Sequence, residues 1–341
     1  MSRHYLITGG AGFIGSNYVE RLISRGEKVT IYDNLSRAGA QINLEWLRNT
    51  KGDQAFNLIR GDIREYDKLL PAVQEADIVV HLAAQVAVTT SVSKPREDFE
   101  INAQGTFNVL EAVRSSRKKP IMIYASTNKV YGGMEDAIIV EKNDRYEYQD
   151  LKFGASEDQA LDFHSPYGCS KGAGDQYVRD YNRIYGVKSV VFRQSCIYGP
   201  RQFGIEDQGW VAWFAIAAVT GRPIKIYGDG KQVRDILYVE DLLNAYDAAI
   251  LNIDKAAGQV FNVGGGSQNT ISIWNEFGPM LEKLTNTTIP ITKGEWRPGD
   301  QKVYVSDIRK AENVLNWKPG INVEEGVTRL VNWVRANQKL F

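Results

Sequence analysis

The sequence predicts an α/β protein built on a doubly wound parallel sheet, and three observations lead to that fold class. Short apolar runs with β character, such as residues 5–8 and 28–32, alternate with helical patterns. The first run leads straight into a turn that contains four glycines between Gly9 and Gly15. The second run ends at an acidic residue, Asp33. Such alternation implies parallel strands joined by crossover helices, with a ligand at the carboxyl ends of the strands, as in Rossmann-type folds.

The glycine-rich turn stands where a dinucleotide phosphate group is expected to bind. Gly9 allows the tight turn, Gly12 lets the backbone approach a pyrophosphate, and Gly15 lets the following helix pack closely on the strand. The N-terminus of that helix then faces the phosphate charge. Asp33 follows Gly15 by 18 residues, where a carboxylate can accept an adenosine 2′-hydroxyl and repel a 2′-phosphate. The pattern favours NAD over NADP, and the nearby Arg37 weakens that preference.

Three further segments fit the same sheet. Residues 59–63 follow a strand, and Asp62 among them is placed to meet the adenine amino group. Residues 76–85 are typical of a buried strand that ends in small residues, where a cofactor backbone can pass. Residues 121–127 form another strand, which ends in hydroxyl side chains. Strands are also predicted at residues 189–192 and 260–263.

A tyrosine and a lysine stand four residues apart in the stretch Ser165-Pro166-Tyr167-Gly168-Cys169-Ser170-Lys171. On a helix, Tyr167 and Lys171 share one face. Ser165 suits the N-cap and Pro166 the first turn, so the helix is predicted to begin there. An ammonium beside a phenol favours the phenolate and lowers the phenol pKa. The pair is thus predicted to take a proton from a substrate hydroxyl, although this spacing alone also fits a surface tyrosine with a neighbouring lysine.

Composition argues against several other classes of protein. The chain has 341 residues, with 41 Lys plus Arg against 41 Asp plus Glu, so no bulk charge attracts nucleic acid or a membrane surface. The longest apolar stretch, residues 211–219, is far shorter than the roughly 20 residues that span a bilayer and predicts a core helix. The two cysteines, Cys169 and Cys196, and the lack of a secretion signal predict a cytoplasmic protein. His81 is expected to be a hydrogen-bonded strand-end residue, and no metal site is predicted.

The spacings Gly9-x-x-Gly12-x-x-Gly15 and Tyr167-x-x-x-Lys171 resemble the extended short-chain dehydrogenase/reductase family, whose members act on nucleotide sugars with NAD. The resemblance implies that Thr127 takes the place of the family's active-site hydroxyl, which hydrogen-bonds the sugar oxygen that reacts. It also implies that Lys171 bridges the nicotinamide ribose hydroxyls and that Arg234 grips the substrate diphosphate. Further matches run along nearly the whole chain, at residues 62–63, 81–84, 102, 130–132, 198–200, 233–235 and 238–241.

The site expected from motif and resemblance has three groups of residues. The catalytic residues are Tyr167, Lys171 and Thr127. The cofactor-binding residues are Gly9, Gly12, Phe13, Ile14, Gly15, Asp33, Asn34, Ser36, Arg37, Asp62, Ile63, Leu82, Ala83, Ala84, Gln85, Asn102, Tyr167 and Lys171. The substrate-binding residues are Gln85, Thr127, Asn128, Lys129, Cys196, Gln208, Gly209, Trp210, Val211, Tyr227, Arg234, Arg297 and Asp300. Cys196 departs from the family pattern, because many members carry an asparagine there.

The residues after the catalytic hydroxyl distinguish members of the family. Its 4,6-dehydratases carry a carboxylate there, whereas this chain reads Thr127-Asn128-Lys129. Other segments resemble the CDP-paratose (CDP-tyvelose) 2-epimerases, at residues 33–37, 43–47, 126–132, 161–167, 207–211, 230–235 and 300–301. This resemblance implies epimerisation at C2 of a CDP-hexose, either CDP-paratose/CDP-tyvelose or CDP-glucose/CDP-mannose. The reaction passes through a 2-keto intermediate, with NAD tightly bound and regenerated in each turnover.

Two alternatives stay open at this point. The same residues serve epimerisation at C4 of a UDP-hexose if the pocket presents a different carbon. A more distant alternative is a catalytically silent, NAD-binding regulatory protein on the same fold.

The strand pattern, the composition and the resemblance also lead to expectations about domains and partners. We expect an NAD-binding domain at residues 1–192 and about 233–264. A smaller, discontinuous nucleotide-sugar-binding domain is expected at about 193–232 and 265–341. A homodimer or homotetramer is expected, with helices around residues 99–113 and 167–185 at the subunit contact. No nucleic-acid or membrane partner is expected.

Overall fold

The computed structural model describes residues 2–297 and 300–341, and the chain forms two compact units. Unit 1 comprises Met1–Val130, Ser165–Arg193 and Tyr246–Phe261. Unit 2 comprises Tyr131–His164, Gln194–Ala245 and Asn262–Phe341. These boundaries differ from the expected domain limits, because residues 131–164 and 233–245 belong to unit 2.

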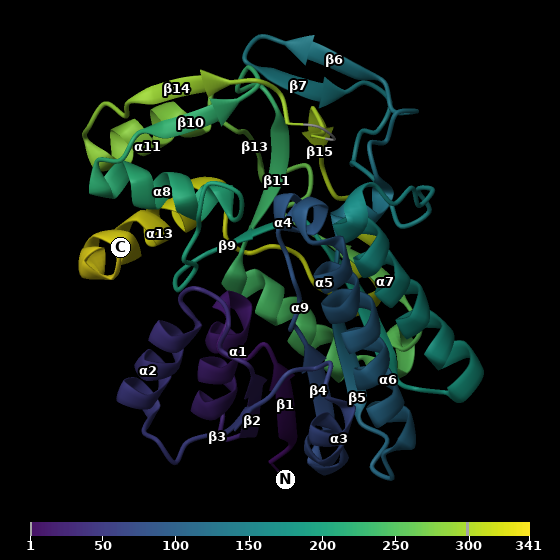
Figure 1. Cartoon of the computed structure of the whole chain (residues 1–341). Coiled ribbons are helices and arrows are strands. Elements are labelled where there is room, and N and C mark those ends of the chain that lie inside the picture. The colour runs from purple at the N-terminus through teal and green to yellow at the C-terminus, as the bar shows by residue number, and fades with distance from the viewer. Residues whose placement is uncertain (1, 298–299) are drawn as a thin grey trace. The chain divides into compact units, whose positions relative to one another are not determined.

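A seven-stranded sheet dominates unit 1 (Figure 1). Its order is β12-β8-β5-β4-β1-β2-β3, so the chain leaves β1 to one side through β2 and returns on the other side at β4. The pairs β1–β2, β1–β4, β2–β3 and β4–β5 are all parallel. This topology confirms the predicted doubly wound sheet. Its strands are β1 (His4–Thr8), β2 (Lys28–Asp33), β3 (Asn57–Arg60), β4 (Ile78–His81), β5 (Ile121–Thr127), β8 (Ser189–Gln194) and β12 (Val260–Val263).

Helices cover both faces of this sheet. One face packs against three helices through buried side chains such as Leu69, Val109 and Val178. On the other face, Tyr18 makes edge contacts with Tyr5 and Tyr246. A strand that is covered on both faces needs a continuous apolar run, because all of its side chains are buried. Residues 78–81 are buried throughout. The helices of this unit are α1 (Phe13–Ser24), α2 (Ala40–Lys51), α3 (Tyr66–Glu75), α6 (Gly105–Ser115), α7 (Ser165–Tyr185), part of α9 (Val239–Leu251) and α10 (Ile253–Ala256).

His81 ends β4 and is fully enclosed. Its Nδ1 lies 2.7 Å from Thr8 Oγ1, and its Nε2 lies 3.1 Å from Thr106 Oγ1. Burial lowers the pKa of this imidazole to about 3, so the ring is neutral at physiological pH. The expected hydrogen-bonded strand-end histidine is confirmed.

A broken helical segment follows β4. The short helices α4 (Val88–Ser93) and α5 (Pro95–Phe99) lead into one turn of π-helix, Glu100–Gln104, and then into α6. The wider turn carries the buried residue Asn102. Single π-helical turns of this kind frequently occur at functional sites.

The described residues of unit 2 form three smaller sheets. Strand β11 pairs with β9 and β15 in parallel and with β13 in antiparallel fashion, β10 pairs with β14, and β6 forms a hairpin with β7. Tyr148 of the hairpin donates to Val303 O at 2.8 Å. The strands are β6 (Ile139–Lys142), β7 (Arg145–Tyr148), β9 (Cys196–Tyr198), β10 (Ile224–Tyr227), β11 (Val233–Tyr238), β13 (Thr270–Ser272), β14 (Ile291–Gly294) and β15 (Val303–Tyr304).

The core of unit 2 is helical and rich in aromatic residues. Helix α8 (Trp210–Thr220) is buried along most of its length, as the apolar run at residues 211–219 predicts. It packs with α11 (Phe277–Thr285) and α13 (Val323–Ala336), and α12 (Arg309–Leu315) precedes the last of these. In the described part of the chain, no helix is both long and apolar enough to cross a membrane.

Candidate active site

The glycine turn after β1 leaves no room for side chains. Gly9 has a φ of +73°, and its N–H donates to Tyr32 O at 2.9 Å. A Cβ on Gly9 would lie 2.8 Å from Ala83 N, and a Cβ on Gly15 would lie 2.3 Å from Gly9 O. The turn, the start of α1 and the segment after β4 therefore approach one another at backbone contact, as a dinucleotide cradle requires.

The N-terminus of α1 offers backbone N–H groups to an anion. Gly12 occupies the N-cap with extended backbone, and no side chain among the described residues caps it. Phe13 and Ile14 form the first turn, which carries no acidic residue. Unsatisfied amide donors and the positive end of the helix dipole suit a pyrophosphate. Together with the cradle, these groups fit NAD.

Asp33 at the end of β2 is held against the same turn. One carboxylate oxygen accepts from Ala11 N at 3.0 Å, and the other accepts from Leu35 N at 2.8 Å. Burial raises the pKa of this carboxyl group, while the two backbone donors and the charge of Arg37 act in the opposite direction. Asn43 of α2 donates to Ala11 O at 3.2 Å. The predicted ribose acceptor is therefore fixed beside the predicted phosphate site.

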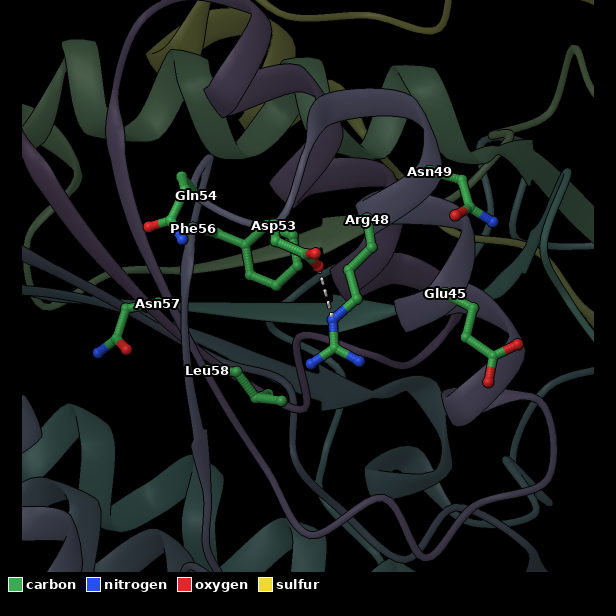
Figure 2. Close-up of a pocket in the computed structure, with 8 residues that line it drawn as sticks. All are labelled: Glu45, Arg48, Asn49, Asp53, Gln54, Phe56, Asn57 and Leu58. Atoms are coloured by element: carbon green, nitrogen blue, oxygen red, sulfur yellow. Dashed lines mark ion pairs between the residues drawn. The ribbon is translucent and has the colours of Figure 1, made fainter.

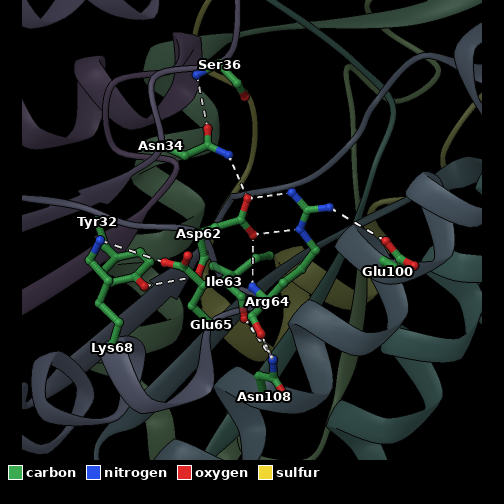
Figure 3. A network of polar contacts seen from close by, with 10 residues as sticks. All are labelled: Tyr32, Asn34, Ser36, Asp62, Ile63, Arg64, Glu65, Lys68, Glu100 and Asn108. Carbon is green, nitrogen blue, oxygen red and sulfur yellow. Dashed lines mark hydrogen bonds and ion pairs between the residues drawn. The ribbon is translucent and has the colours of Figure 1, made fainter.

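A polar network joins the ends of β2 and β3 (Figure 3). Asp62 accepts two hydrogen bonds from the Arg64 guanidinium, at 2.9 and 2.8 Å, and one from Asn34 Nδ2 at 3.0 Å. The Arg64 hydrogen bonds lower the pKa of Asp62 to about 2, so the carboxylate is ionised at neutral pH. Asn34 Oδ1 accepts from Ser36 N, and Ile63 O accepts from Asn108 Nδ2. Four of the expected cofactor residues thus lie in one network.

The segment after β4 contains four further residues expected to bind cofactor, Leu82, Ala83, Ala84 and Gln85. Leu82 N donates to Thr8 O at 3.0 Å, which continues the ladder of the sheet. The Gln85 side chain turns inward and donates to Asp98 Oδ1 at 2.8 Å.

Asn102 holds this loop in place. Its Oδ1 accepts from Gln85 N at 2.9 Å, and its Nδ2 donates to Gln85 O at 3.0 Å. The Asn102 side chain therefore acts within the protein, as a support for the loop that carries several expected cofactor residues.

The three expected catalytic residues meet in unit 1. Thr127 ends β5, and Tyr167 and Lys171 lie on α7, with only 8% and 4% of their surfaces exposed. Lys171 Nζ donates to Ala125 O at 2.6 Å and lies 4.4 Å from the centre of the Tyr124 ring. A hydrogen bond with Thr127 lowers the pKa of the Tyr167 phenol.

Helix α7 begins where the sequence predicts. Its first residue is Ser165, and the Ser165 hydroxyl accepts a hydrogen bond from Gly168 N at 3.3 Å. Ser165 has a φ of +65°, a left-handed conformation that is strained for a residue with a side chain. Tyr167 therefore lies in the first turn, beside a backbone position that the rest of the fold must hold in place.

The pKa values of the pair differ from the prediction. Burial raises the pKa of Tyr167 to about 12; the Thr127 hydrogen bond and the charge of Arg37 lower it, and the charge of Asp98 raises it. Burial lowers the pKa of Lys171 to about 7. The Lys171 ammonium is directed at Ala125 O, and desolvation dominates the phenol. The phenol pKa therefore lies above its ordinary value, opposite to the predicted direction, because desolvation outweighs the favourable neighbours.

A buried ion pair between Asp175 and Arg193 joins α7 to β8. Asp175 lies one helical turn after Lys171 and accepts two hydrogen bonds from Arg193 of β8, both at 2.9 Å. The same carboxylate accepts from Ser126 Oγ at 2.7 Å. Helix α7, β8 and the end of β5 are thus tied together next to Thr127. The four-residue spacing from Lys171 was a signal in the sequence that could have identified Asp175.

Asn128 and Lys129 continue from β5 into a 3₁₀ turn, Asn128–Tyr131. Thr127 Oγ1 donates to Asn128 Oδ1 at 3.3 Å and accepts from Lys129 N at 3.2 Å. The side chains after Thr127 are therefore an amide and an ammonium, and neither can act as a carboxylate acid or base.

Most of the expected substrate residues lie in unit 2. Arg234 is buried and donates to Asp300 Oδ1 and to Gln301 O, both at 2.7 Å. The Arg297 guanidinium lies 4.0 Å from the centre of the Tyr227 ring, and it also donates to Asp207 at 2.9 Å. The two arginines expected to bind substrate are thus each paired with a carboxylate.

The remaining expected residues surround the start of α8. Gln208 exchanges backbone hydrogen bonds with Ile205, and Gly209 has a φ of +73° as the N-cap. Trp210 Nε1 donates to Cys196 Sγ at 3.5 Å. Val211 is buried in the hydrophobic core of unit 2, so its side chain packs inside the protein.

A separate polar hollow lies on the surface of unit 1 (Figure 2). Its lining comes from the end of α2 and residues 53–58, and includes an ion pair between Arg48 and Asp53 at 3.3 Å. None of the expected site residues lines it.

A doubly wound sheet, a glycine cradle at a helix N-terminus and a buried tyrosine–lysine pair on one helix face define a dinucleotide-dependent enzyme of the short-chain dehydrogenase/reductase class. A family model described as GDP-mannose 4,6 dehydratase matches residues 6–330. The chain belongs to this family, the NAD-dependent nucleotide-sugar epimerases and dehydratases. The resemblance inferred from the motifs is confirmed.

Similar proteins include epimerases of several nucleotide sugars. The chain is 45% identical to a CDP-paratose 2-epimerase of Salmonella typhi, over 97% of this chain and 99% of that protein. The crystal structure of a Thermotoga maritima UDP-glucose 4-epimerase with UDP-glucose has a TM-score of 0.83 and 30% identity, covering 98% and 99% of the two chains. A Thermus thermophilus UDP-glucose 4-epimerase in complex with NAD has a TM-score of 0.81 and 31% identity, covering 97% and 99%.

Proposed function

We propose that this protein is an epimerase that inverts C2 of a CDP-hexose through a transient 2-keto intermediate. The expected pairs are CDP-paratose with CDP-tyvelose and CDP-glucose with CDP-mannose. The observation that carries this proposal is the 45% identity to a CDP-paratose 2-epimerase along essentially the whole chain. The side chains after Thr127 also support it, because they offer no carboxylate for the elimination that a dehydratase performs.

The residues of unit 1 that we propose to hold NAD follow the carboxyl ends of the strands. Gly9, Gly12 and Gly15 shape the phosphate site, and Asp33 accepts a ribose hydroxyl. The network around Asp62 lies beside β2 and β3, where the adenosine would bind. When bound, NAD would supply the hydride acceptor, and it would have to stay bound through each turnover so that the same hydride can return to the opposite face of the sugar.

Tyr167 acts as the proton acceptor and donor in this proposal. As a phenolate it takes the proton of the C2 hydroxyl when the alcohol becomes a ketone, and it gives the proton back when the alcohol forms again. Thr127 donates a hydrogen bond to the sugar oxygen, and Lys171 supplies a nearby cation. Because burial raises the pKa of Tyr167 to about 12, the neighbouring positive charges are needed to populate the phenolate.

We propose that Arg234 and Arg297 hold the substrate diphosphate in unit 2. Charge-assisted contacts with a guanidinium tolerate movement of the sugar, which must turn between the two half-reactions. Arg234 is bound to Asp300 at 2.7 Å, so diphosphate binding replaces a carboxylate by another anion. This exchange keeps the buried guanidinium paired throughout.

Epimerisation at C4 of a UDP-hexose is the second candidate. Its support is the likeness to the Thermotoga maritima structure with UDP-glucose, at a TM-score of 0.83. A catalytically silent NAD-binding protein is a third candidate, but this chain retains Tyr167, Lys171 and Arg234.

Proton NMR of the purified protein with CDP-glucose, in deuterated buffer and without added cofactor, separates these candidates. We expect CDP-mannose with no solvent deuterium at C2, because the hydride returns internally from retained NAD. Conversion of UDP-glucose to UDP-galactose, with C2 of CDP-glucose unchanged, would assign the enzyme to C4. Retained NAD with no turnover of any CDP- or UDP-hexose, including CDP-paratose, would support the silent protein.

We propose that the enzyme is a homodimer or homotetramer whose subunits meet through α6 and α7. Several large apolar side chains on these helices are exposed, among them Phe107, Tyr177, Ile184 and Tyr185. The Phe107 and Tyr177 rings lie 5.8 Å apart, centre to centre, and Tyr181 lies 5.0 Å from Tyr185. A group of exposed aromatic and apolar side chains of this kind is typical of a subunit interface.

A further inference from the structure

Asp98 is a buried carboxylate beside the catalytic helix. It lies on α5, immediately before the π-helical turn, and only 1% of its surface is exposed. Ser170 Oγ donates to Asp98 Oδ2 at 2.5 Å. Gln85 Nε2 and Asn102 Nδ2 donate to Asp98 Oδ1, at 2.8 and 3.1 Å. Both carboxylate oxygens therefore act only as acceptors, as they do in an ionised carboxylate.

The partners of this carboxylate are all neutral. Among residues 2–297 and 300–341, no lysine or arginine forms an ion pair with Asp98. A buried charge without a countercharge is unfavourable, because the protein interior replaces the solvation of water poorly. The groups around Asp98 should therefore show what a carboxylate does at this buried position.

Asp98 lies close enough to the two proposed catalytic residues of α7 for its charge to act on them. Ser170 lies between Tyr167 and Lys171 on α7, and the charge of Asp98 acts on both of their side chains. It opposes the phenolate of Tyr167 and favours the ammonium of Lys171. By contrast, the other buried carboxylate near Lys171, Asp175, is paired with Arg193.

Other charged and titratable groups also act on Tyr167 and Lys171. Arg37 and Asp98 act on Tyr167, with a hydrogen bond involving Thr127. Lys171 faces Asp98 and Asp175, the Tyr124 ring, and the neutral imidazole of His81. Of these carboxylates, Asp98 is the one that acts on both members of the pair.

We propose that Asp98 is a positioning residue that fixes the first turns of α7 through Ser170 and whose negative charge keeps Lys171 protonated. This inference rests on the roles proposed above for Tyr167 and Lys171. Neutralising Asp98 would make the phenolate easier to form and the ammonium harder to keep. Both pKa values would then fall. Loosening of α7 without loss of the charge would not lower the two pKa values together.

The variant Asp98→Asn tests this inference because it keeps the shape and removes the charge. Its amide oxygen can accept from Gln85 and Asn102, and the Ser170 hydroxyl can turn to Tyr167 O, which lies 3.2 Å away. We expect both limbs of the pH–rate profile to move to lower pH by about half a unit to one unit. The exposed Asp254, paired with Lys188 at 2.8 Å, supplies the matched control Asp254→Asn, which should move neither limb.

A second measurement needs no substrate. Competitive acetylation by acetic anhydride, followed by mass spectrometry of the peptide that carries Lys171, reports the pH at which its amine loses a proton. The midpoint should fall by about half a unit in Asp98→Asn. If the wild-type protein turns over no CDP- or UDP-hexose, the proposed function fails, and this midpoint still decides the role of Asp98.

Three results would overturn the inference. The first is a lower turnover in Asp98→Asn with unchanged limbs and midpoint, which would leave Asp98 a purely structural residue. The second is an equal shift in Asp254→Asn. The third concerns Asp98→Glu, the variant to use if Asp98→Asn does not fold. It keeps the charge, so its Lys171 midpoint should match wild type even if turnover falls, and a displaced midpoint would contradict the proposal.

Discussion

At the scale of single residues, the site places two ionisable groups where water is largely excluded. Burial favours the neutral form of both, which raises the pKa of Tyr167 to about 12 and lowers that of Lys171 to about 7. The two shifts have the same physical cause and opposite signs, because one group is an acid that becomes anionic and the other a base that becomes cationic. Their protonation states therefore depend on neighbouring charges.

Replacing Tyr167 by phenylalanine should reduce turnover by a factor of about 10² to 10⁴, because the positioned proton acceptor is lost. The amount of NAD that copurifies should stay close to wild type, since only one hydroxyl is removed. Turnover by NMR and the absorbance of released nucleotide measure the two quantities. Tyr177→Phe is the matched control on the same helix, with its ring half exposed, and a comparable loss there would argue against a specific role for Tyr167.

Replacing Lys171 by methionine should change how stability depends on pH. The folded pKa of about 7 lies below the unfolded value of about 10.4, so the unfolded chain binds more protons between these values. The wild-type free energy of unfolding should therefore rise with pH from 7 toward 10, by about 2 kcal/mol between pH 7 and 9, and Lys171→Met should lose that rise.

Urea unfolding of nucleotide-free protein at pH 7 and 9 measures this difference. Lys188→Met, at an exposed lysine that follows the same helix, should keep the wild-type dependence. Equal slopes for wild type and Lys171→Met would contradict the low pKa of Lys171.

At the scale of elements, the junction of β1 and α1 depends on backbone contact. Gly9 and Gly15 approach each other so closely that a Cβ on Gly15 would overlap Gly9 O at 2.3 Å and Gly10 Cα at 2.6 Å. Backbone atoms cannot turn aside as a flexible side chain does. The N-terminus of α1 can therefore keep its place at the predicted phosphate site only while Gly15 lacks a side chain.

The variant Gly15→Ala should be less stable by about 1–3 kcal/mol, the range for overpacking a closely packed site, and should copurify with little NAD. Thermal unfolding and nucleotide content measure both effects. Gly320→Ala is the control, because the nearest atom to its new Cβ is Asp241 Oδ1 at 3.5 Å, an ordinary contact. NAD retention at wild-type level in Gly15→Ala would contradict the cradle.

At the scale of the whole molecule, the residues proposed for the cofactor and those proposed for the substrate diphosphate lie in different units. Unit 1 carries the cradle, Thr127 and the tyrosine–lysine pair, and unit 2 carries the arginines proposed for the diphosphate. Because the units draw on alternating stretches of sequence, each is completed only when distant segments meet. The exposed apolar residues on α6 and α7 belong to unit 1 alone.

Replacing Ile184 by aspartate should shift the protein toward monomers, because a charge at the proposed subunit contact must be desolvated on association. Sedimentation velocity measures the change. Ile184 is 65% exposed, and Ile138 in unit 2 is 54% exposed, so Ile138→Asp is a matched control that should leave the assembly unchanged. An unchanged assembly in Ile184→Asp, or an equal effect of both substitutions, would place the contact elsewhere.

The elements that local sequence controls were predicted well. The alternating runs gave the sheet strands, the turn glycines gave the start of α1, and Ser165 marked the start of α7. Each depends on neighbours in the chain, through periodicity, a positive φ or a cap. The residues that bind the substrate were harder to predict from the sequence. Val211 fits a motif yet packs in the core.

The sequence by itself determined the fold class and the glycine turn, and the four-residue spacing paired Tyr167 with Lys171, whereas Thr127 was proposed from the family resemblance. Only the tertiary structure decided what surrounds them. It brought Asp98 from α5 and Arg193 from β8 to α7, and it directed the Lys171 ammonium at a backbone carbonyl. The physical reason is that pKa values and buried pairs depend on desolvation and on charges from distant segments, which meet only when the chain folds.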